Sequence, residues 1–219
     1  MARDRTAAAA VAAQLSTKSH IAIADVTDGE AVRRGCAESA AALGPIDILV
    51  NNAGSVETIP FLRTTPETFQ HMFAVHTLGA FHTIQAVLPA MLERGSGRVV
   101  NVASIAGLMG APYVAHYVTA KHALVGLTRA LAVEYGPKGI TFNAVCPGYT
   151  DTDLVSGSVG KIAKKTGRSE ADALAQILRD AGQSRLVLPE EVAAAVVNFC
   201  RPESASTTGE ALALMGADA

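Results

Sequence analysis

Residues 46–54 read IDILVNNAG, an apolar run that passes directly into a turn of small and polar residues. A short apolar run bounded by turn residues is typical of a strand that is covered on both faces of a parallel sheet. The small residues up to Gly54 let the backbone approach a ligand closely. The stretch therefore predicts a buried strand whose carboxyl end opens onto a binding site.

The same pattern recurs along the chain and alternates with helical segments. Helices are expected over 28–43, 66–92, 114–135 and 189–199, and the other strands are expected in HIAIAD (20–25), RVVNVAS (98–104), ITFNAV (140–145) and ALALM (211–215). Strands that alternate with helices indicate an α/β fold built on a parallel sheet. We expect one Rossmann-like, doubly wound domain over 1–219.

A polar, glycine-dotted segment over 149–188 interrupts this alternation. It contains a short amphipathic pattern that starts at Ser169, and Asp172 three residues later is consistent with a capping box. In open α/β sheets, a long excursion after the carboxyl end of a strand usually covers the ligand crevice. We expect 149–188 to cover the substrate.

Composition excludes several classes of protein. The net charge of −2 offers no basic footprint for nucleic acid. The three cysteines share no metal-ligand spacing and the six histidines are scattered, so we expect no metal site. No stretch approaches the ~18 apolar residues of a membrane span. We expect a soluble, cytoplasmic protein.

The strongest chemical signal lies in SIAGLMGAPYVAHYVTAK, residues 104–121. Tyr117 and Lys121 are four residues apart on a predicted helix and therefore share a face. A nearby ammonium stabilises phenolate and lowers the pKa of a tyrosine. Ser104 follows a strand end, where its hydroxyl can hydrogen-bond a substrate oxygen. Together these groups suit proton transfer to or from a carbonyl or alcohol. The Tyr–Lys spacing alone is more often a chance surface pair.

Other small and polar residues follow the ends of predicted strands. Asp25 closes HIAIAD, residues 51–54 follow ILV, and Pro147 and Gly148 are followed by Thr150 and Thr152. A nucleotide binds at the carboxyl ends of parallel strands.

LVNNAG, Ser104 thirteen residues before Tyr117, YVTAK and NAVCPG occur in an order that resembles the short-chain dehydrogenase/reductase family over the whole chain. The resemblance implies that Tyr117 is the catalytic acid/base and that Ser104 orients and polarises the carbonyl. It implies that Lys121 lowers the tyrosine pKa and holds the nicotinamide ribose. The implied cofactor contacts are Asp25 and Val26 at the adenine, Asn52, Ala53 and Gly54 on the adenosine ribose side, and Pro147, Gly148, Thr150 and Thr152 at the nicotinamide.

One position departs from the family pattern within FAVHTLGAF (73–81). The family usually has an asparagine there, which anchors a water beside the lysine, and this chain has His76. Its backbone carbonyl can still hold that water and make His76 part of the proton relay. The other interpretation is a packed or solvated helix histidine.

The opening segment MARDRTAAAAVAAQ (1–14) resembles the end of a second strand and the helix after it, and no glycine precedes Gly29. The resemblance implies that the first β-α unit, with its glycine-rich phosphate turn, and most of the second strand are absent. We then expect a bared edge on 46–50 and weak dinucleotide binding. Arg3 favours NADP over NAD, because a guanidinium pairs well with a 2′-phosphate; a solvated charge is the alternative.

These residues predict an NAD(P)-dependent oxidoreductase that interconverts a carbonyl and a secondary alcohol. The chain resembles the 3-oxoacyl reductase and 3-hydroxyacyl dehydrogenase branch of the family. The alternative is a non-catalytic subunit that pairs with a complete homologue. A hydrolase is disfavoured because VASIA lacks the glycines of a nucleophile elbow. The resemblance also implies a dimer or tetramer through 66–92 and 114–135, the latter with apolar Val125, Leu127, Ala130 and Leu131.

Overall fold

The computed structural model describes residues 1–216, apart from the side chain of Leu154. Its centre is a parallel sheet in the order β1-β2-β3-β4. The strands are β1 (Ile48–Asn51), β2 (Gly97–Val102), β3 (Ile140–Pro147) and β4 (Ala211–Leu214). Each overlaps a run that the sequence predicted as a strand, although β2 begins one residue earlier and β3 ends two residues later than predicted. The last three residues of the predicted domain lie outside the described residues.

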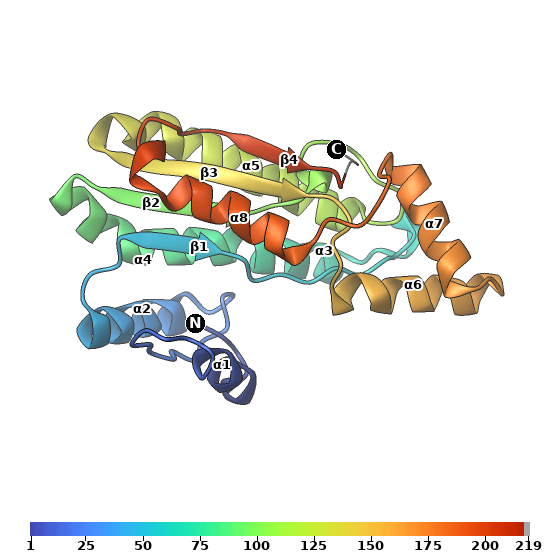
Figure 1. Cartoon of the computed structure of the whole chain (residues 1–219), viewed down its shortest axis with the longest axis horizontal. Coiled ribbons are helices and arrows are strands. Elements are labelled where there is room, and N and C mark those ends of the chain that lie inside the picture. The colour runs from blue at the N-terminus through green and yellow to red at the C-terminus, as the bar shows by residue number, and fades with distance from the viewer. Residues whose placement is uncertain (217–219) are drawn as a thin grey trace.

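Helices cover both faces of this sheet. Figure 1 shows α4 (Gly79–Arg94) and α5 (Ala115–Tyr135) behind it and α8 (Pro189–Cys200) in front. The strand β3 is buried along its whole length, and its Ile140 and Phe142 pack with Val99 and Met91 in the main core. The Rossmann-like α/β architecture and the helices predicted over 114–135 and 189–199 are confirmed.

The first residues form a small unit below β1, made of α1 (Arg5–Ala12) and α2 (Gly29–Leu43) (Figure 1). The Asp4 and Asp28 carboxylates cap these helices by accepting hydrogen bonds from first-turn amides. The prediction of a sheet strand in HIAIAD is wrong. Ile23 makes only an isolated parallel bridge with Ala2, because Ala2 donates to Ala22 and accepts from Ala24.

The strand β1, which belongs to the IDILVNNAG run, is less buried than expected. Within residues 1–216 it pairs only with β2. Its Ile48 and Val50 side chains are 47% and 42% exposed. The prediction that this run is covered on both faces is wrong, because segment 20–25 bonds to Ala2 instead of to β1. The bared edge expected on 46–50 is present, since β1 is the edge strand of the described sheet.

The segment 66–92 is not one uninterrupted α-helix. It divides into α3 (Pro66–Phe73), a π-helical turn (Ala74–Leu78) and α4. A π-helical turn widens the backbone by one residue per turn, and such turns are frequent at functional sites. This turn carries His76.

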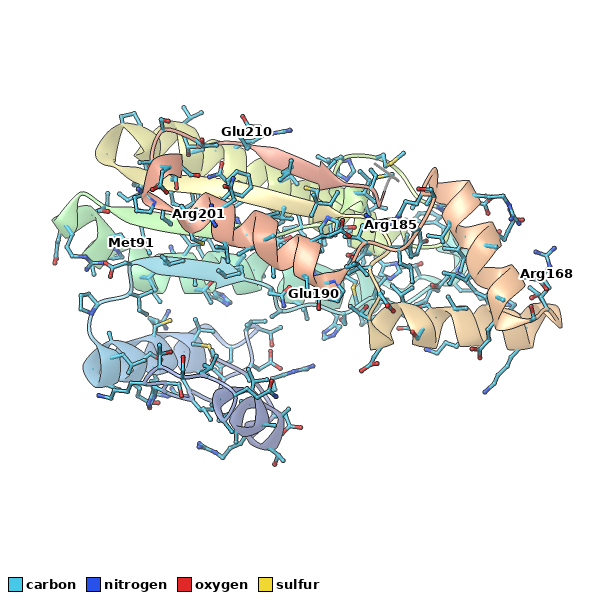
Figure 2. The ribbon with its side chains drawn as sticks, viewed as in Figure 1. Met91, Arg168, Arg185, Glu190, Arg201 and Glu210 are labelled. Atoms are coloured by element: carbon cyan, nitrogen blue, oxygen red, sulfur yellow. The ribbon has the colours of Figure 1, made fainter. Side chains whose placement is uncertain are left out.

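The segment 149–188 holds two helices, α6 (Asp153–Thr166) and α7 (Glu170–Ala181). The predicted start of α7 is confirmed, since the Ser169 hydroxyl accepts from the Asp172 amide at 3.1 Å. The sequence analysis missed α6, whose Gly157 and Gly160 lower helix propensity. Figure 2 shows Arg168 projecting at the turn between the two helices, away from the sheet.

The apolar residues predicted to line a subunit interface on α5 mostly face inward. Val125 is buried, and Leu127 and Leu131 pack against the main core. Of that set only Ala130 is exposed, and Val133 adds an 80% exposed side chain. The four predicted residues therefore supply little of the expected exposed apolar surface, and Val133 supplies more. No helix described within residues 1–216 is long and apolar enough to cross a membrane.

Candidate active site

Ser104 lies where β2 ends and a short 3-10 helix (Ile105–Gly107) begins. Its hydroxyl accepts a hydrogen bond from the Ala106 amide at 3.1 Å and reaches the Pro147 carbonyl oxygen at 3.4 Å. The side chain therefore joins the ends of β2 and β3. It occupies the position at the carboxyl edge of the sheet that the sequence predicted.

Tyr117 and Lys121 project from the first turns of α5 toward Ser104. The Lys121 ammonium is buried, donates to the Val102 carbonyl at 2.9 Å and lies 5.6 Å from the centre of the Tyr117 ring. The Ser104 hydroxyl lies close enough to the Tyr117 phenol to lower its pKa, although burial outweighs this effect. The structure thus brings the three predicted groups together.

The titration of this pair differs from the expectation. Burial raises the pKa of Tyr117 above its ordinary 10.0, and the Ser104 hydroxyl only partly opposes this. Burial lowers the pKa of Lys121 from 10.5 to about 7. The expectation that Lys121 lowers the tyrosine pKa is not met, because the ammonium lies over the ring and desolvation dominates both groups. Tyr117 is therefore a protonated phenol at neutral pH.

His76 completes the group, so that His76, Ser104, Tyr117 and Lys121 form what we call the catalytic cluster. The imidazole is 3% exposed and contacts the Tyr117 ring edge to face, with 5.1 Å between centroids. Its Nε2 lies 2.7 Å from the Ser55 carbonyl, which assigns the proton to Nε2 and leaves the buried Nδ1 as an acceptor without a partner. Burial, aided by Lys121, lowers the pKa of His76 to about 4.

The turn Asn52, Ala53 and Gly54 lies exposed beside this histidine. A Cβ at Gly54 would stand 2.7 Å from the His76 ring, and a Cβ at Gly79 would stand 2.9 Å from the Val26 side chain. A cavity of about 20 Å³ connects these parts and is lined by Val26, Asn51, Ala53, Val75, His76, Gly79, Ala80, Val102 and Leu124. Val26 and Ala53 therefore share one wall of the site with His76.

Asp25 and Arg3 lie together at the N-terminal side of this site. The Asp25 carboxylate accepts from the Thr27 amide and hydroxyl, and these hydrogen bonds hold the pKa of Asp25 below its ordinary value. Arg3 lies 3.7 Å from it as an exposed ion pair. Asp25 therefore pairs with Arg3 and, through its hydrogen bonds to Thr27, stabilises the turn that follows it.

Pro147 and Gly148 end β3, as predicted, and the buried Gln183 holds the loop that begins at Tyr149. Gln183 accepts from the Tyr149 amide at 2.7 Å and donates to the Tyr149 carbonyl. Gly148 lies so close to the Gln183 amide that a Cβ would overlap it. Thr150 bridges to Val187, and Thr152 is the N-cap residue of α6. Contacts thus join Pro147 to Ser104, but Thr150 and Thr152 bond within their own loop.

Sequence analysis missed the polar residues that support this site. Thr83 donates to Asn51, which donates to Asn101, which donates to Thr128, at 2.7–2.9 Å. This chain of hydrogen bonds ties β1 and β2 to α4 and α5. Polar residues inside an otherwise apolar strand, as in RVVNVAS, are the signal that pointed to it, because a buried amide needs partners.

His82 was also missed, although it holds the Val26 loop. Its Nδ1 lies 3.0 Å from the Val26 carbonyl oxygen, and the ring lies against Gly29 at the start of α2. A single helix histidine gives no sequence signal for this role. Among the described residues, no group of three or more His, Cys, Asp or Glu side chains could hold a metal ion.

Known proteins resemble this chain along almost its whole length. The family model described as "Enoyl-(Acyl carrier protein) reductase" matches residues 1–216. An acetoacetyl-CoA reductase of Rhizobium meliloti is 36% identical over 192 residues, which cover 88% of this chain and 76% of that protein. The protein named "Inactive 2-(S)-hydroxypropyl-CoM dehydrogenase 2" from Xanthobacter autotrophicus is 37% identical over 215 residues, 98% of this chain and 91% of that protein.

A solved structure also has the same fold as this chain. A variant of actinorhodin polyketide ketoreductase, determined with NADPH, superposes with a TM-score of 0.89 at 32% identity and covers 98% of this chain and 84% of its own. The site geometry, the family match and this fold agree. The chain belongs to the short-chain dehydrogenase/reductase family and is an NAD(P)-dependent dehydrogenase/reductase.

Proposed function

We propose that the chain reduces a carbonyl to a secondary alcohol, with Tyr117 as the proton donor. The observation that carries this is the catalytic cluster itself, a phenol close to the Ser104 hydroxyl and 5.6 Å, ring centre to nitrogen, from a buried ammonium. The nicotinamide cofactor supplies the hydride that reaches the carbonyl carbon. The Ser104 hydroxyl binds the carbonyl oxygen, and Tyr117 delivers its proton to that oxygen.

The raised pKa of Tyr117 favours reduction over oxidation. A protonated phenol can give a proton to a carbonyl oxygen, whereas alcohol oxidation needs phenolate as the base. Lys121, with its pKa near 7, is the group that can return a proton to Tyr117 after turnover. We therefore expect reduction to be faster near neutral pH and oxidation to gain as the pH rises.

The residues present fit a dinucleotide. The unpartnered His76 Nδ1 needs a donor such as a ribose hydroxyl, and Gly54 and Gly79 keep close space open beside it. Asp25 and Val26 would hold the adenine side, Asn52 to Gly54 the ribose, and Pro147 to Thr152 the nicotinamide. Arg3 would pair with the 2′-phosphate of NADP, because its exposed guanidinium can donate two hydrogen bonds to a phosphate group.

The substrate class we propose is a 3-oxoacyl thioester. Its support is the similarity to an acetoacetyl-CoA reductase and to a polyketide ketoreductase. The test follows NADPH and NADH oxidation with 3-oxoacyl thioesters and simple ketones. Faster turnover of the thioesters, with NADPH preferred, supports the proposal; turnover of neither class at any pH refutes it.

A second candidate is a non-catalytic subunit. One relative that covers nearly the whole chain is named as inactive, and here an imidazole of low pKa occupies the position between Gly54 and Tyr117. Two measurements distinguish the candidates. A non-catalytic subunit would not reduce ketones when assayed alone, and it would co-purify with a complete homologue when the two are mixed.

We also propose a homo-oligomer that packs through the outer faces of α4 and α5. Its support is the exposure of Leu78, Phe81 and Val133 on these helices and the turn before α4. Light scattering at micromolar concentration tests it. A dimer or tetramer that becomes monomeric in Val133→Asp supports the interface, and a monomeric parent chain contradicts it.

A further inference from the structure

A buried glutamine links the end of α7 to the loop after β3. Gln183 is 5% exposed and follows Gly182, the left-handed residue that ends α7. Its backbone amide donates to the Leu178 carbonyl at 2.9 Å, a bond that closes the last turn of the helix. The backbone from which the Gln183 side chain projects is therefore held in place.

The side-chain amide of Gln183 makes three hydrogen bonds. Its oxygen accepts from the Tyr149 amide at 2.7 Å, and its nitrogen donates to the carbonyl oxygens of Tyr149 and Arg185, both at 3.2 Å. Figure 2 shows Arg185 near the carboxyl end of β3. A leucine would fill a similar volume without the cost of burying an amide. What the glutamine adds to packing is therefore these three hydrogen bonds.

The loop that Gln183 holds begins at Pro147, the last residue of β3. Proline has no backbone N–H, so the amides of the next two residues hold this end of the strand. The Gly148 amide donates to the Leu214 carbonyl at 2.8 Å, and the Tyr149 amide donates to Gln183. A Cβ at Gly148 would overlap the Gln183 amide, so these two residues are in direct contact. The position of Pro147 therefore depends on Gln183.

Pro147 in turn contacts Ser104 of the catalytic cluster. The Ser104 hydroxyl accepts from the Ala106 amide at 3.1 Å and donates to the Pro147 carbonyl oxygen at 3.4 Å. An O–H···O hydrogen bond is usually about 2.7–2.8 Å long, so the bond to Pro147 orients the hydroxyl but holds it weakly. A closer Pro147 carbonyl would retain the hydroxyl, and a more distant one would leave it without orientation.

We propose that Gln183 is a positioning residue for carbonyl reduction. It holds Pro147 at the distance that orients the Ser104 hydroxyl and still lets it donate to the substrate oxygen. The inference rests on the proposed function, because it assumes that Ser104 binds the carbonyl. It gives a residue at the end of α7 a role in the chemistry at the end of β2.

The first test compares Gln183→Leu with a control, Gln176→Leu, in the NADPH-dependent reduction of a 3-oxoacyl thioester. Gln176 lies on the same helix, and its side chain bonds to Asp180 and Arg179 at the surface. We expect kcat to fall about tenfold to a hundredfold in Gln183→Leu, because a small displacement of a reacting group is costly. Gln176→Leu should keep the kcat of the parent chain. Equal kcat in the two variants would overturn the proposal.

A double-mutant cycle separates positioning from a general loss of structure. Ser104→Ala removes the hydroxyl through which Gln183 acts. We therefore expect Gln183→Leu to lower the residual kcat less than about twofold in the Ser104→Ala background. The same loss in both backgrounds would mean that Gln183 only supports the fold, and the proposal would be refuted.

Amide NMR tests the connection without turnover. The Ala106 amide bonds to the Ser104 hydroxyl, so its chemical shift should move in Gln183→Leu and stay unchanged in Gln176→Leu. The Tyr149 amide, which loses its acceptor, should exchange with solvent at least about tenfold faster in Gln183→Leu. These responses in a chain that reduces no carbonyl would leave the connection standing and contradict only the proposed function.

Gly148→Ala provides a second variant for the case that Gln183→Leu does not fold. Its added Cβ displaces the Gln183 amide without removing it. We expect the chemical shift of the Ala106 amide to move in this variant as well. An Ala106 amide signal that is the same in Gly148→Ala as in the parent chain would refute the inference.

Discussion

The catalytic cluster and the adenosine-side segment (residues 1–28) are built in different ways. In the cluster His76 and Lys121 are buried and Ser104 and Tyr117 are half-buried. Three contacts hold it: Lys121 bonds β2, Ser104 joins β2 to β3, and His76 contacts the turn after β1.

The adenosine-side segment is joined to the rest of the chain by His82, whose Nδ1 lies 3.0 Å from the Val26 carbonyl oxygen, and by the exposed Lys18, which donates to the Ala42 carbonyl. Within the segment, Ala2 makes two backbone hydrogen bonds and Arg3 one exposed ion pair. We therefore expect substitutions in the catalytic cluster to disturb the protein more than substitutions in residues 1–28.

The largest effect is expected at the most buried charge of the cluster. Lys121→Met should lower the turnover number by about a thousandfold, because the group that reprotonates Tyr117 is lost. The free energy of unfolding should instead rise in Lys121→Met. The folded pKa of Lys121 is near 7, below the 10.5 of the unfolded chain, so burying it costs stability fully below pH 7 and less as the pH approaches 10.5.

Denaturant unfolding of both proteins from pH 6 to 10 checks this. The stability of Lys121→Met relative to the parent should be highest at pH 6 and fall as the pH rises. A difference that does not vary with pH would mean that Lys121 is solvated, and the contrast with the adenosine-side segment would be lost.

A smaller effect is expected from His76. Its folded pKa of about 4 lies below the ordinary 6.5, so stability that is present above pH 6.5 is lost as the pH falls toward 4. This loss amounts to about 3 kcal/mol. His76→Asn should remove that acid sensitivity, which thermal unfolding at pH 4.5 and 7 measures. Equal acid sensitivity in both proteins would contradict the burial of a neutral imidazole.

The smallest effect is expected at Arg3, in the adenosine-side segment. Arg3→Ala removes an exposed ion pair, so the free energy of unfolding should change by less than about 1 kcal/mol. The KM for NADPH should rise about tenfold while that for NADH stays constant. Arg3→Lys is the control and should keep part of the preference. Parallel changes for both cofactors would show that Arg3 does not contact a 2′-phosphate.

Local sequence signals predicted the cluster well because each one depends on few residues. Tyr117 and Lys121 follow from helical spacing, and Ser104 follows from a strand end. HIAIAD failed as a strand because pairing depends on a neighbour that local sequence does not specify. The titration was also misjudged, since desolvation in the folded core outweighs the charge of Lys121, and no local pattern reports burial depth.

Helix breaks were predicted less well than helices. The π-helical turn that carries His76 has no proline or glycine to mark it, since Gly79 follows it. The α6 helix was hidden by Gly157 and Gly160, whose cost is offset by packing against α7 through Val159, Ala163 and Ala173. Tertiary contacts with α7 therefore decided the α6 helix, and such contacts are not visible in a local sequence pattern.

The most direct test of the central claim is steady-state turnover of Tyr117→Phe beside the parent chain, with NADPH and a 3-oxoacyl thioester. The change removes one hydroxyl, so thermal unfolding should show an intact fold. We expect loss of nearly all turnover, about a thousandfold or more, because Ser104 cannot replace the proton donor. Turnover within about threefold of the parent would contradict Tyr117 as the acid and with it the proposed mechanism.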